Sequence, residues 1–258
     1  MGQYYRNSIL SKNYKNVKQP VVATLCPYEY DNGAKLMEFS YVHNGLMKPI
    51  EWLLANDFYG YPFVTAGDYS DNIFTKKYQD MTIFVTNKEY FMEENDECSI
   101  NKIKEVIGEG NYTTLMTVGE CPMDYDECIA NFIEDVSGLR VKSGINIYEA
   151  ASNFEDTKKY KTIKATIPAY DDIPDYKYII NFDKKEYTVM PKYEPKKWNI
   201  NSLSLLCAFG NGLGGGDYHG TDMDFVGRWA FDRIGLTNDK NAIKGFTKIT
   251  PKFKESWG

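Results

Sequence analysis

The sequence predicts an α+β fold in which a few helices pack against one antiparallel or mixed β-sheet. Segments of strand composition recur near both ends of the 258-residue chain. Short turn-forming segments can join most neighbouring strands, which favours this arrangement over alternating βαβ units. Hydrophobic residues make up 43% of the chain, enough for a sizeable core. We therefore expect a single α+β domain over residues 1–258.

The first elements predicted are a β-hairpin and a helix. Residues 21–30 and 34–42 have strand composition and flank Asp31-Asn32-Gly33, where Asn-Gly can adopt the positive φ angles of a tight turn. Residues 46–56 then place apolar side chains at helical spacing. Pro49 falls in the first turn of this helix, where its missing N–H does no harm.

Two strands are predicted next, over residues 63–66 and 81–86. The acidic residues 67–72 between them favour turns and are expected to form a loop. The patterns beyond predict helices over residues 99–107 and 124–136 and a strand over 112–118.

The second half of the chain adds further strands. They are predicted over residues 161–167, 176–182 and 186–190. Asp183-Lys184-Lys185 is a natural turn between the last two, so these should form a hairpin.

Composition narrows the class of protein. The formal charge is −6, which disfavours nonspecific attraction to nucleic-acid phosphates. The apolar runs are far shorter than the roughly 20 residues that a membrane-spanning helix needs. Five cysteines are scattered without CxxC pairs. We expect a cytoplasmic protein that binds no membrane.

Residues 210–220, the glycine segment, carry the most concentrated signal in the sequence. Six of these eleven residues are glycine, which opens backbone conformations closed to other residues. Such a loop can approach a ligand closely. It can equally be a structural turn where chain segments crowd together.

A helix is predicted directly after the glycine segment. Thr221 and Asp224 have the spacing of a capping box, and Gly235 would end the helix. One stripe of this helix would be apolar, through Phe225, Val226, Trp229, Ala230 and Ile234. Another stripe would hold an i,i+4 charge ladder, through Asp224, Arg228 and Asp232.

A glycine loop that leads into a helix N-terminus resembles an anion-binding site. The acidic side chains nearby would repel a bare phosphate, so the hypothesis requires that Arg228 or Arg233 folds back or that a divalent cation bridges. The residues predicted to bind the ligand are Gly214, Gly215, Gly216, Asp217, Tyr218, His219, Arg228, Arg233, Asp68 and Tyr69.

Two catalytic alternatives involve the same loops. If the Gly-Asp-Tyr loops at Asp68 and Asp217 converge, Asp217 and His219, together with Asp68 or Asp71, could supply ligands to Mg, Mn or Zn. Alternatively, Asp68 and Asp217 could act as an acid–base pair. Of the two histidines, His219 is the preferred functional candidate over His43, which follows the predicted first hairpin. Each aspartate could instead be a turn residue that accepts hydrogen bonds from nearby backbone N–H groups.

Four motifs together carry a resemblance to known proteins. They are Met1-Gly2-Gln3-Tyr4-Tyr5, the DNGAKLME segment at residues 31–38, the AGDY segment at residues 66–69, and the glycine segment followed by GRWAFDRI at residues 227–234. On these motifs the chain resembles an uncharacterised family of phage and prophage proteins. The resemblance covers roughly the first 75 residues and about 60 near the C-terminus. Leu213 stands where the family often has arginine, which weakens a phosphate-binding role for that position.

The resemblance implies a biological context and no particular reaction. Phage accessory proteins often counter host immunity, so the resemblance implies a protein of the host cytoplasm. In that context, the first hypothesis is that the glycine segment binds a small nucleotide-like signal without turnover. Two other hypotheses remain open. One is a metal-dependent phosphoester hydrolase, and the other is an inhibitor that binds a host defence protein.

Overall fold

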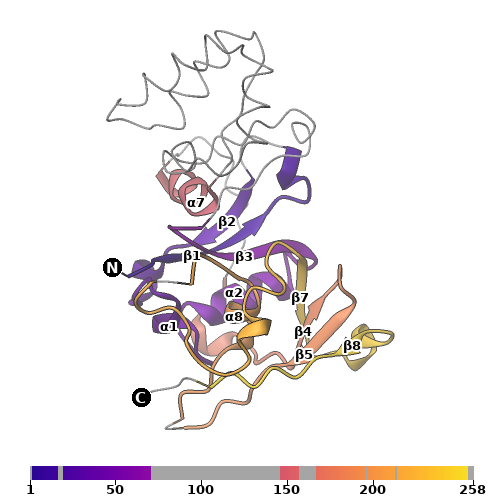
Figure 1. Cartoon of the computed structure of the whole chain (residues 1–258). Helices are drawn as coiled ribbons and strands as arrows, with labels where there is room; N and C mark the ends of the chain where they lie inside the picture. The colour runs from indigo at the N-terminus through magenta and orange to yellow at the C-terminus, as the bar shows by residue number, and fades with distance from the viewer. Residues whose placement is uncertain are drawn as a thin grey trace, which may run out of the picture. The chain divides into compact units, whose positions relative to one another are not determined.

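The computed structural model of the chain describes residues 2–16, 20–70, 146–156, 167–195, 197–212 and 214–254 (Figure 1). These residues belong to one packing unit, which comprises residues 1–71 and 146–258. The elements predicted over residues 81–86, 99–107, 112–118 and 124–136, and all but the end of 161–167, lie outside the described residues. The single domain predicted over residues 1–258 therefore stays a prediction.

The predicted α+β class is confirmed, with a mixed and mostly antiparallel sheet. The strands among the described residues are β1 (Tyr5–Leu10), β2 (Val21–Leu25), β3 (Tyr61–Gly67), β4 (Tyr178–Asn181), β5 (Glu186–Val189), β6 (Ala208–Phe209), β7 (Arg233–Thr237) and β8 (Thr247–Lys248). Their order is β2-β1-β3-β7-β4-β5-β8, and β6 pairs with β3 off this path. The β3–β6 and β5–β8 pairs are parallel, and the other pairs are antiparallel.

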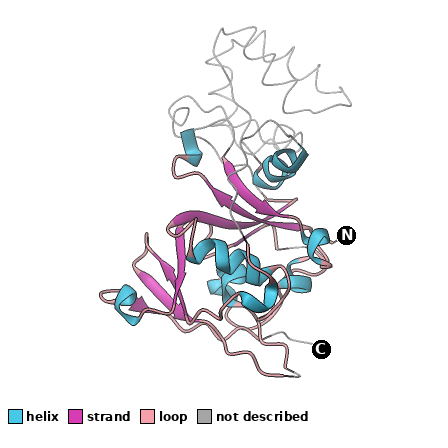
Figure 2. Cartoon of the chain, turned by 180° about the vertical axis from the view of Figure 1, so that it is seen from behind, coloured by secondary structure: helices cyan, strands magenta, loops and turns pink. Residues whose placement is uncertain are grey.

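Helices cover both sides of the sheet. The α-helices are α1 (Leu36–Phe39), α2 (Met47–Ala55), α7 (Ile147–Asp156) and α8 (Ser202–Leu206). Short 3-10 helices are η1 (Tyr14–Asn16), η2 (Pro27–Tyr30), η4 (Tyr170–Asp172), η5 (Met223–Phe225) and η6 (Lys240–Ile243). Figures 1 and 2 show α1, α2 and α8 on one side of the sheet and α7 beside β1 and β2 on the other. None of the helices described here has the length and apolar character needed to cross a membrane.

Strand β3 lies at the centre of this arrangement. Phe63, Val64 and Ala66 are all fully buried, because helices cover both faces of the strand. Thr65 is also buried, and its hydroxyl donates a 2.7 Å hydrogen bond to the Asn7 side chain of β1. The predicted strand over residues 63–66 is thus confirmed, and a buried polar pair ties it to its neighbour.

Helix α2 forms as the apolar spacing predicts. Ile50, Leu53 and Leu54 are buried in the main core, and Pro49 occupies the first turn. The predicted hairpin near the C-terminal half is also confirmed, since β4 and β5 pair antiparallel around the turn. Lys185 supplies the left-handed conformation of that turn, with a φ of 53°.

The predicted hairpin of residues 21–30 and 34–42 is wrong. Residues 21–25 form β2, but that strand pairs with β1, which the sequence analysis did not predict. Pro27 begins η2, and Asp31 ends it in the left-handed region at a φ of 52°. The next residues form α1, where the Glu38 carboxylate accepts a 2.9 Å hydrogen bond from the Lys35 N–H. The sequence therefore predicted a turn correctly, but this turn follows a 3-10 helix and does not join two strands.

The helix predicted after Thr221 is also wrong, and so is its charge ladder. Only Met223–Phe225 is helical, as η5, and turns lead from it to β7, where Gly235 lies in mid-strand. The N–H groups of Gly227 and Trp229 donate to the carbonyls of Leu205 (2.9 Å) and Leu206 (2.7 Å), instead of to carbonyls one helical turn back. Gly227 has a φ of 74°, and a Cβ there would lie 2.7 Å from the Ala208 carbonyl oxygen. Tertiary hydrogen bonding to α8 thus overrides the local helical pattern.

Candidate functional site

The glycine segment is packed around Gln3, a residue with no exposed surface. A Cβ added at Gly67, Gly210 or Gly214 would collide with the Gln3 side chain. Among the predicted ligand-binding glycines, Gly216 has a φ of 94°, and a Cβ added there would lie 2.6 Å from the Lys35 side chain. The lack of side chains therefore lets several chain segments meet, which is the structural alternative considered above.

The two Gly-Asp-Tyr loops do converge, and Gln3 is the residue between them. With its amide oriented to satisfy its neighbours, Gln3 donates to the Asp217 carboxylate and accepts from the Tyr69 N–H, both at 3.1 Å. Asp68 accepts a 3.0 Å hydrogen bond from the Tyr4 N–H, and Asp217 accepts one of 2.9 Å from the Gly214 N–H. Both carboxylates thus hold backbone N–H groups, as turn aspartates do.

A small cavity of about 250 Å³ lies against the glycine segment. Of the residues predicted to bind a ligand, Asp217 and Tyr218 line it. Tyr5 also lines it, and burial, followed by the Asp217 carboxylate, raises the pKa of this phenol well above its ordinary range.

His219 is exposed, and within the described residues no group of three His, Cys, Asp or Glu side chains is arranged to hold a metal ion. The proposed metal set of Asp68, Asp217 and His219 is therefore not assembled.

Gly214→Ala should destabilise the protein by about 1–3 kcal/mol, because the new methyl group would overlap the Cβ and backbone N of Gln3. The measurement is the free energy of unfolding from urea titration. Gly45→Ala is the matched control, since its nearest neighbours would lie 3.6 Å away. Equal stability of the two variants would contradict the packing role of Gly214.

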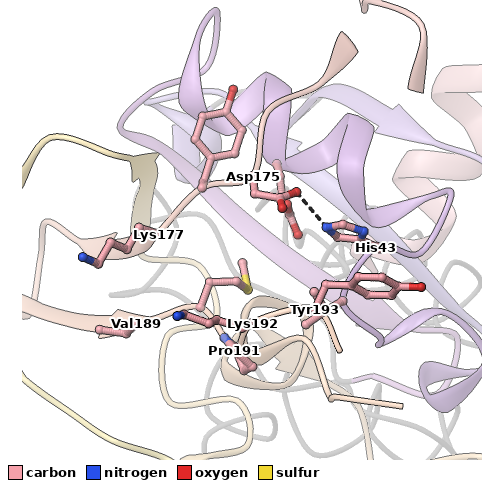
Figure 3. Close-up of a pocket in the computed structure, with 11 residues that line it drawn as sticks. His43, Asp175, Lys177, Val189, Pro191, Lys192 and Tyr193 are labelled. Carbon is pink, nitrogen blue, oxygen red and sulfur yellow. Dashed lines mark hydrogen bonds and ion pairs between the residues drawn. The ribbon is translucent and has the colours of Figure 1, made fainter. Parts of the chain in front are cut away.

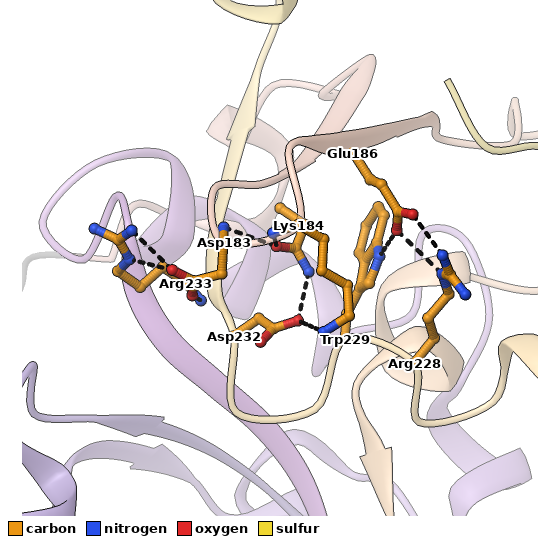
Figure 4. A network of polar contacts seen from close by, with 8 residues as sticks. Asp183, Lys184, Glu186, Arg228, Trp229, Asp232 and Arg233 are labelled. Carbon is orange, nitrogen blue, oxygen red and sulfur yellow. Dashed lines mark hydrogen bonds and ion pairs between the residues drawn. The ribbon is translucent and has the colours of Figure 1, made fainter. Parts of the chain in front are cut away.

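The two predicted ligand arginines bind carboxylates of the β4–β5 hairpin (Figure 4). Arg228 donates two hydrogen bonds to Glu186, at 2.5 and 3.1 Å. Arg233 forms an ion pair of 2.7 Å with Asp183. The Arg228 hydrogen bonds hold the pKa of Glu186 below its ordinary value. Burial would raise the pKa of Asp183, but its hydrogen bonds to Arg233 lower it overall. Neither arginine folds back onto the glycine segment.

A larger cavity, about 510 Å³ in volume, lies between α2 and the chain on either side of the β4–β5 hairpin (Figure 3). We call it the carboxyl cavity, after Glu51 and Asp175. Its lining consists of Val42, His43, Glu51, Asp175, Tyr176, Lys177, Val189, Met190, Pro191, Lys192 and Tyr193. Figure 3 places Lys177 and Lys192 on the side away from His43. Both lysines are exposed, and no carboxylate among the described residues forms an ion pair with either.

His43 is held in this cavity from several directions. Its Nε2 lies 2.7 Å from the Asp175 carboxylate, and its ring stacks on Tyr193 with 4.2 Å between centroids. The Tyr170 hydroxyl donates to the His43 carbonyl at 2.5 Å. The φ of His43 is 63°, a conformation uncommon outside glycine. Such strain persists only where the surroundings enforce it.

The charge of Asp175 is balanced by a neighbouring lysine. The same carboxylate oxygen that meets His43 lies 3.4 Å from the Lys48 ammonium. Lys48 is buried, donates to the Ile173 carbonyl at 2.9 Å, and lies 4.9 Å from the centre of the Tyr170 ring. Asp175 therefore adds little net repulsion toward an anionic ligand.

Glu51 is a buried carboxyl group on the cavity side of α2. It is 5% exposed, and its Oε1 accepts a 2.6 Å hydrogen bond from Asn201, which caps α8. Burial raises the pKa of Glu51 to about 7, although the Asn201 hydrogen bond acts in the opposite direction. A carboxyl group with this pKa can both donate and accept hydrogen bonds near neutral pH.

None of the three polar groups of this site, His43, Glu51 and Asp175, was predicted from the sequence to bind a ligand. The sequence did hold a signal for Glu51, since it lies four residues after Met47 and three before Leu54, on the buried face of α2. An acid at that position is unusual and indicates a special environment. His43 was considered and ranked below His219. Nothing in the sequence around Asp175 indicates that it meets His43, because that contact spans 132 residues.

The carboxyl cavity brings together aromatic side chains, the hydrogen-bonded His43–Asp175 pair and two lysine side chains. These are the features expected of a small-molecule site. The function must be argued from this geometry. Comparisons with protein-family models, with curated proteins and with solved structures found no match to this chain.

Proposed function

We propose that this protein binds a small nucleotide-like ligand, without turnover, in the carboxyl cavity. The observation that carries the proposal is that one cavity is lined by a buried carboxyl group, the stacked rings of His43 and Tyr193, and two exposed lysines. Its volume of about 510 Å³ falls within the roughly 300–1,000 Å³ of typical ligand pockets.

The base and the phosphate of a nucleotide each have a complementary group in this cavity. Glu51, with a pKa of about 7, can donate a hydrogen bond to a ring nitrogen or carbonyl of a base. Lys177 and Lys192 can neutralise phosphate as point charges. The proposal therefore keeps the class of ligand expected from the sequence and moves the site away from the glycine segment.

The biological role proposed with it is that of a phage accessory protein that sequesters a nucleotide signal of host immunity. This step rests on the sequence resemblance, as does the alternative that the protein inhibits a host defence protein directly. Neither role depends on the geometry of the cavity.

Hydrolysis of the bound ligand is a second candidate function. The specific observation in its favour is the His43–Asp175 pair, because a carboxylate that orients an imidazole is the usual arrangement of a general base. In this case the ligand would be a substrate and would not survive incubation with the protein.

Calorimetric titration with the four common ribonucleoside monophosphates tests the proposal. We expect saturable binding of at least one, and a loss of about tenfold in affinity in Lys192→Ala, because one phosphate contact is removed. Lys240→Ala, at an exposed lysine of η6 outside the cavity, is the matched control and should bind as the wild type does. Flat titrations with folded protein would overturn the proposal. Chromatography after incubation should recover the ligand intact, and a hydrolysis product would support the second candidate instead.

A further inference from the structure

A second cavity adjoins the carboxyl cavity. It has a volume of about 590 Å³, and it shares Val42, His43 and Tyr193 with the first. We call it the aromatic cavity, because Tyr41, Tyr170 and Trp198 line the rest of it together with Asn44, Gly45 and Lys197. Each cavity has the volume of a small-molecule site, so the two together could hold a ligand with two separate ring systems.

His43 and Tyr193 form the boundary between the two cavities. Their rings are almost parallel, at 4° and 4.2 Å. The hydrogen bonds of His43 to Asp175 and Tyr170 fix this pair from both sides, since Asp175 lines the carboxyl cavity and Tyr170 the aromatic one. A ligand that spans both cavities would therefore cross a boundary that is already ordered, which lowers the entropic cost of binding.

Trp198 gives the aromatic cavity an open stacking surface. Trp198 is 80% exposed, although it forms a T-shaped contact with Tyr41, with 5.1 Å between ring centroids. Tyr170 and Tyr193 in the same cavity are 40% and 50% exposed. Single exposed aromatic residues are ordinary, but a group that lines one cavity is the kind of platform on which nucleobases stack.

The distribution of charge distinguishes the two cavities. Among the described residues, Lys197 is the only lysine that lines the aromatic cavity, and the Glu194 carboxylate forms an ion pair with it. In the carboxyl cavity, Lys177 and Lys192 form no ion pair within the described residues. Phosphate is therefore favoured next to Lys192, and an uncharged ring is favoured next to Trp198.

We infer that the ligand is a dinucleotide, with the first nucleotide in the carboxyl cavity, its 5′-phosphate near Lys192, and the second base against Trp198 in the aromatic cavity. The inference rests on the proposed function, because it extends the same ligand across the His43–Tyr193 boundary. This class of ligand is defined by its chemistry: two nucleosides are joined through phosphate, and each base has a ring face that can stack.

Calorimetric titration with adenosine monophosphate and with 5′-phosphorylated diadenylate tests this inference. We expect the dinucleotide to bind about 10- to 100-fold more tightly, because stacking of the second base on Trp198 adds to the first site. Trp198→Ala should abolish this difference, and Trp198→Phe, which keeps an aromatic face, should retain most of it. Since Trp198 is 80% exposed, neither substitution should disturb folding.

The possible outcomes separate the inference from the proposed function. Equal affinity for the two ligands, or a dinucleotide preference that survives in Trp198→Ala, would overturn the inference and leave the proposed function standing. If neither the four mononucleotides nor the dinucleotide binds to folded protein, both are wrong.

Discussion

Trp229→Ala should lower the free energy of unfolding by about 3–5 kcal/mol, the range found when a large buried aromatic residue is truncated. Trp229 has no exposed surface, and its indole N–H donates a 2.8 Å hydrogen bond to Glu186. The truncation removes the packing of the ring against the main core and one donor to a carboxylate that also binds Arg228. Urea unfolding followed by far-UV circular dichroism measures the effect, and an unchanged m-value would show that unfolding exposes the same amount of surface in both proteins.

Two other substitutions give this prediction its controls. Trp198→Ala removes the same side chain from an 80% exposed position and should change stability by less than about 0.5 kcal/mol. Trp229→Phe keeps most of the buried area but loses the N–H donor, so it should cost about 1–3 kcal/mol. It also remains measurable if the alanine variant does not fold. Similar losses in Trp229→Ala and Trp198→Ala would refute the burial of Trp229, and similar losses in Trp229→Phe and Trp198→Ala would refute its bond to Glu186.

The fold was predictable where local pattern and tertiary context agree. The apolar spacing of residues 46–56 predicts α2, and the turn at residues 183–185 predicts the β4–β5 hairpin. Both succeed because the signal lies within a short stretch of chain. The same holds for β3, whose run of apolar residues is buried from both sides.

The failures occur where distant segments compete with a local signal. Residues 221–235 carry a good helical pattern. However, N–H groups of this segment donate hydrogen bonds to carbonyls of α8, and the Trp229 indole donates one to Glu186, 43 residues away. Asn32-Gly33 marked a turn without indicating what enters and leaves it. Sequence periodicity holds no information on these long-range partners, so it could not decide the outcome.

The candidate site shows the same limit more strongly. The density of glycines predicted a ligand-binding loop at residues 210–220, but in the structure the absence of side chains there leaves space for Gln3. The residues that line the carboxyl cavity come from four separate stretches of the chain, at residues 42–43, 51, 175–177 and 189–193. Only Glu51 has a sequence signal of its own, as an acid on an apolar helix face.

Glu51→Gln should change how stability depends on pH, by about 3 kcal/mol between pH 4.5 and pH 8. The pKa of Glu51 is about 7 in the folded protein, against an ordinary value of 4.5. Between these values the folded state holds a proton that the unfolded state has released, so the free energy of unfolding falls as pH rises through this window and levels off above it. A shift of this size corresponds to about 3 kcal/mol. Glutamine removes the titration and keeps an acceptor for the Asn201 side chain.

The measurement is the difference in free energy of unfolding between Glu51→Gln and the wild type at several pH values. Relative to the wild type, the variant should gain stability as pH rises from 4.5 to 7, because only the wild type must bury a carboxylate near Asp175, with partial compensation from Lys48. Asp183 and Glu186 have lowered pKa values, so both proteins lose stability through these groups as pH falls. This loss is the same in the variant and the wild type, and it cancels in the difference between them. Glu29→Gln, at an exposed carboxyl on η2, is the matched control for replacing a carboxyl group by an amide. A constant difference for Glu51→Gln across this range would mean that the cavity carboxyl is charged at neutral pH, and Glu51 could then not donate a hydrogen bond to a bound base.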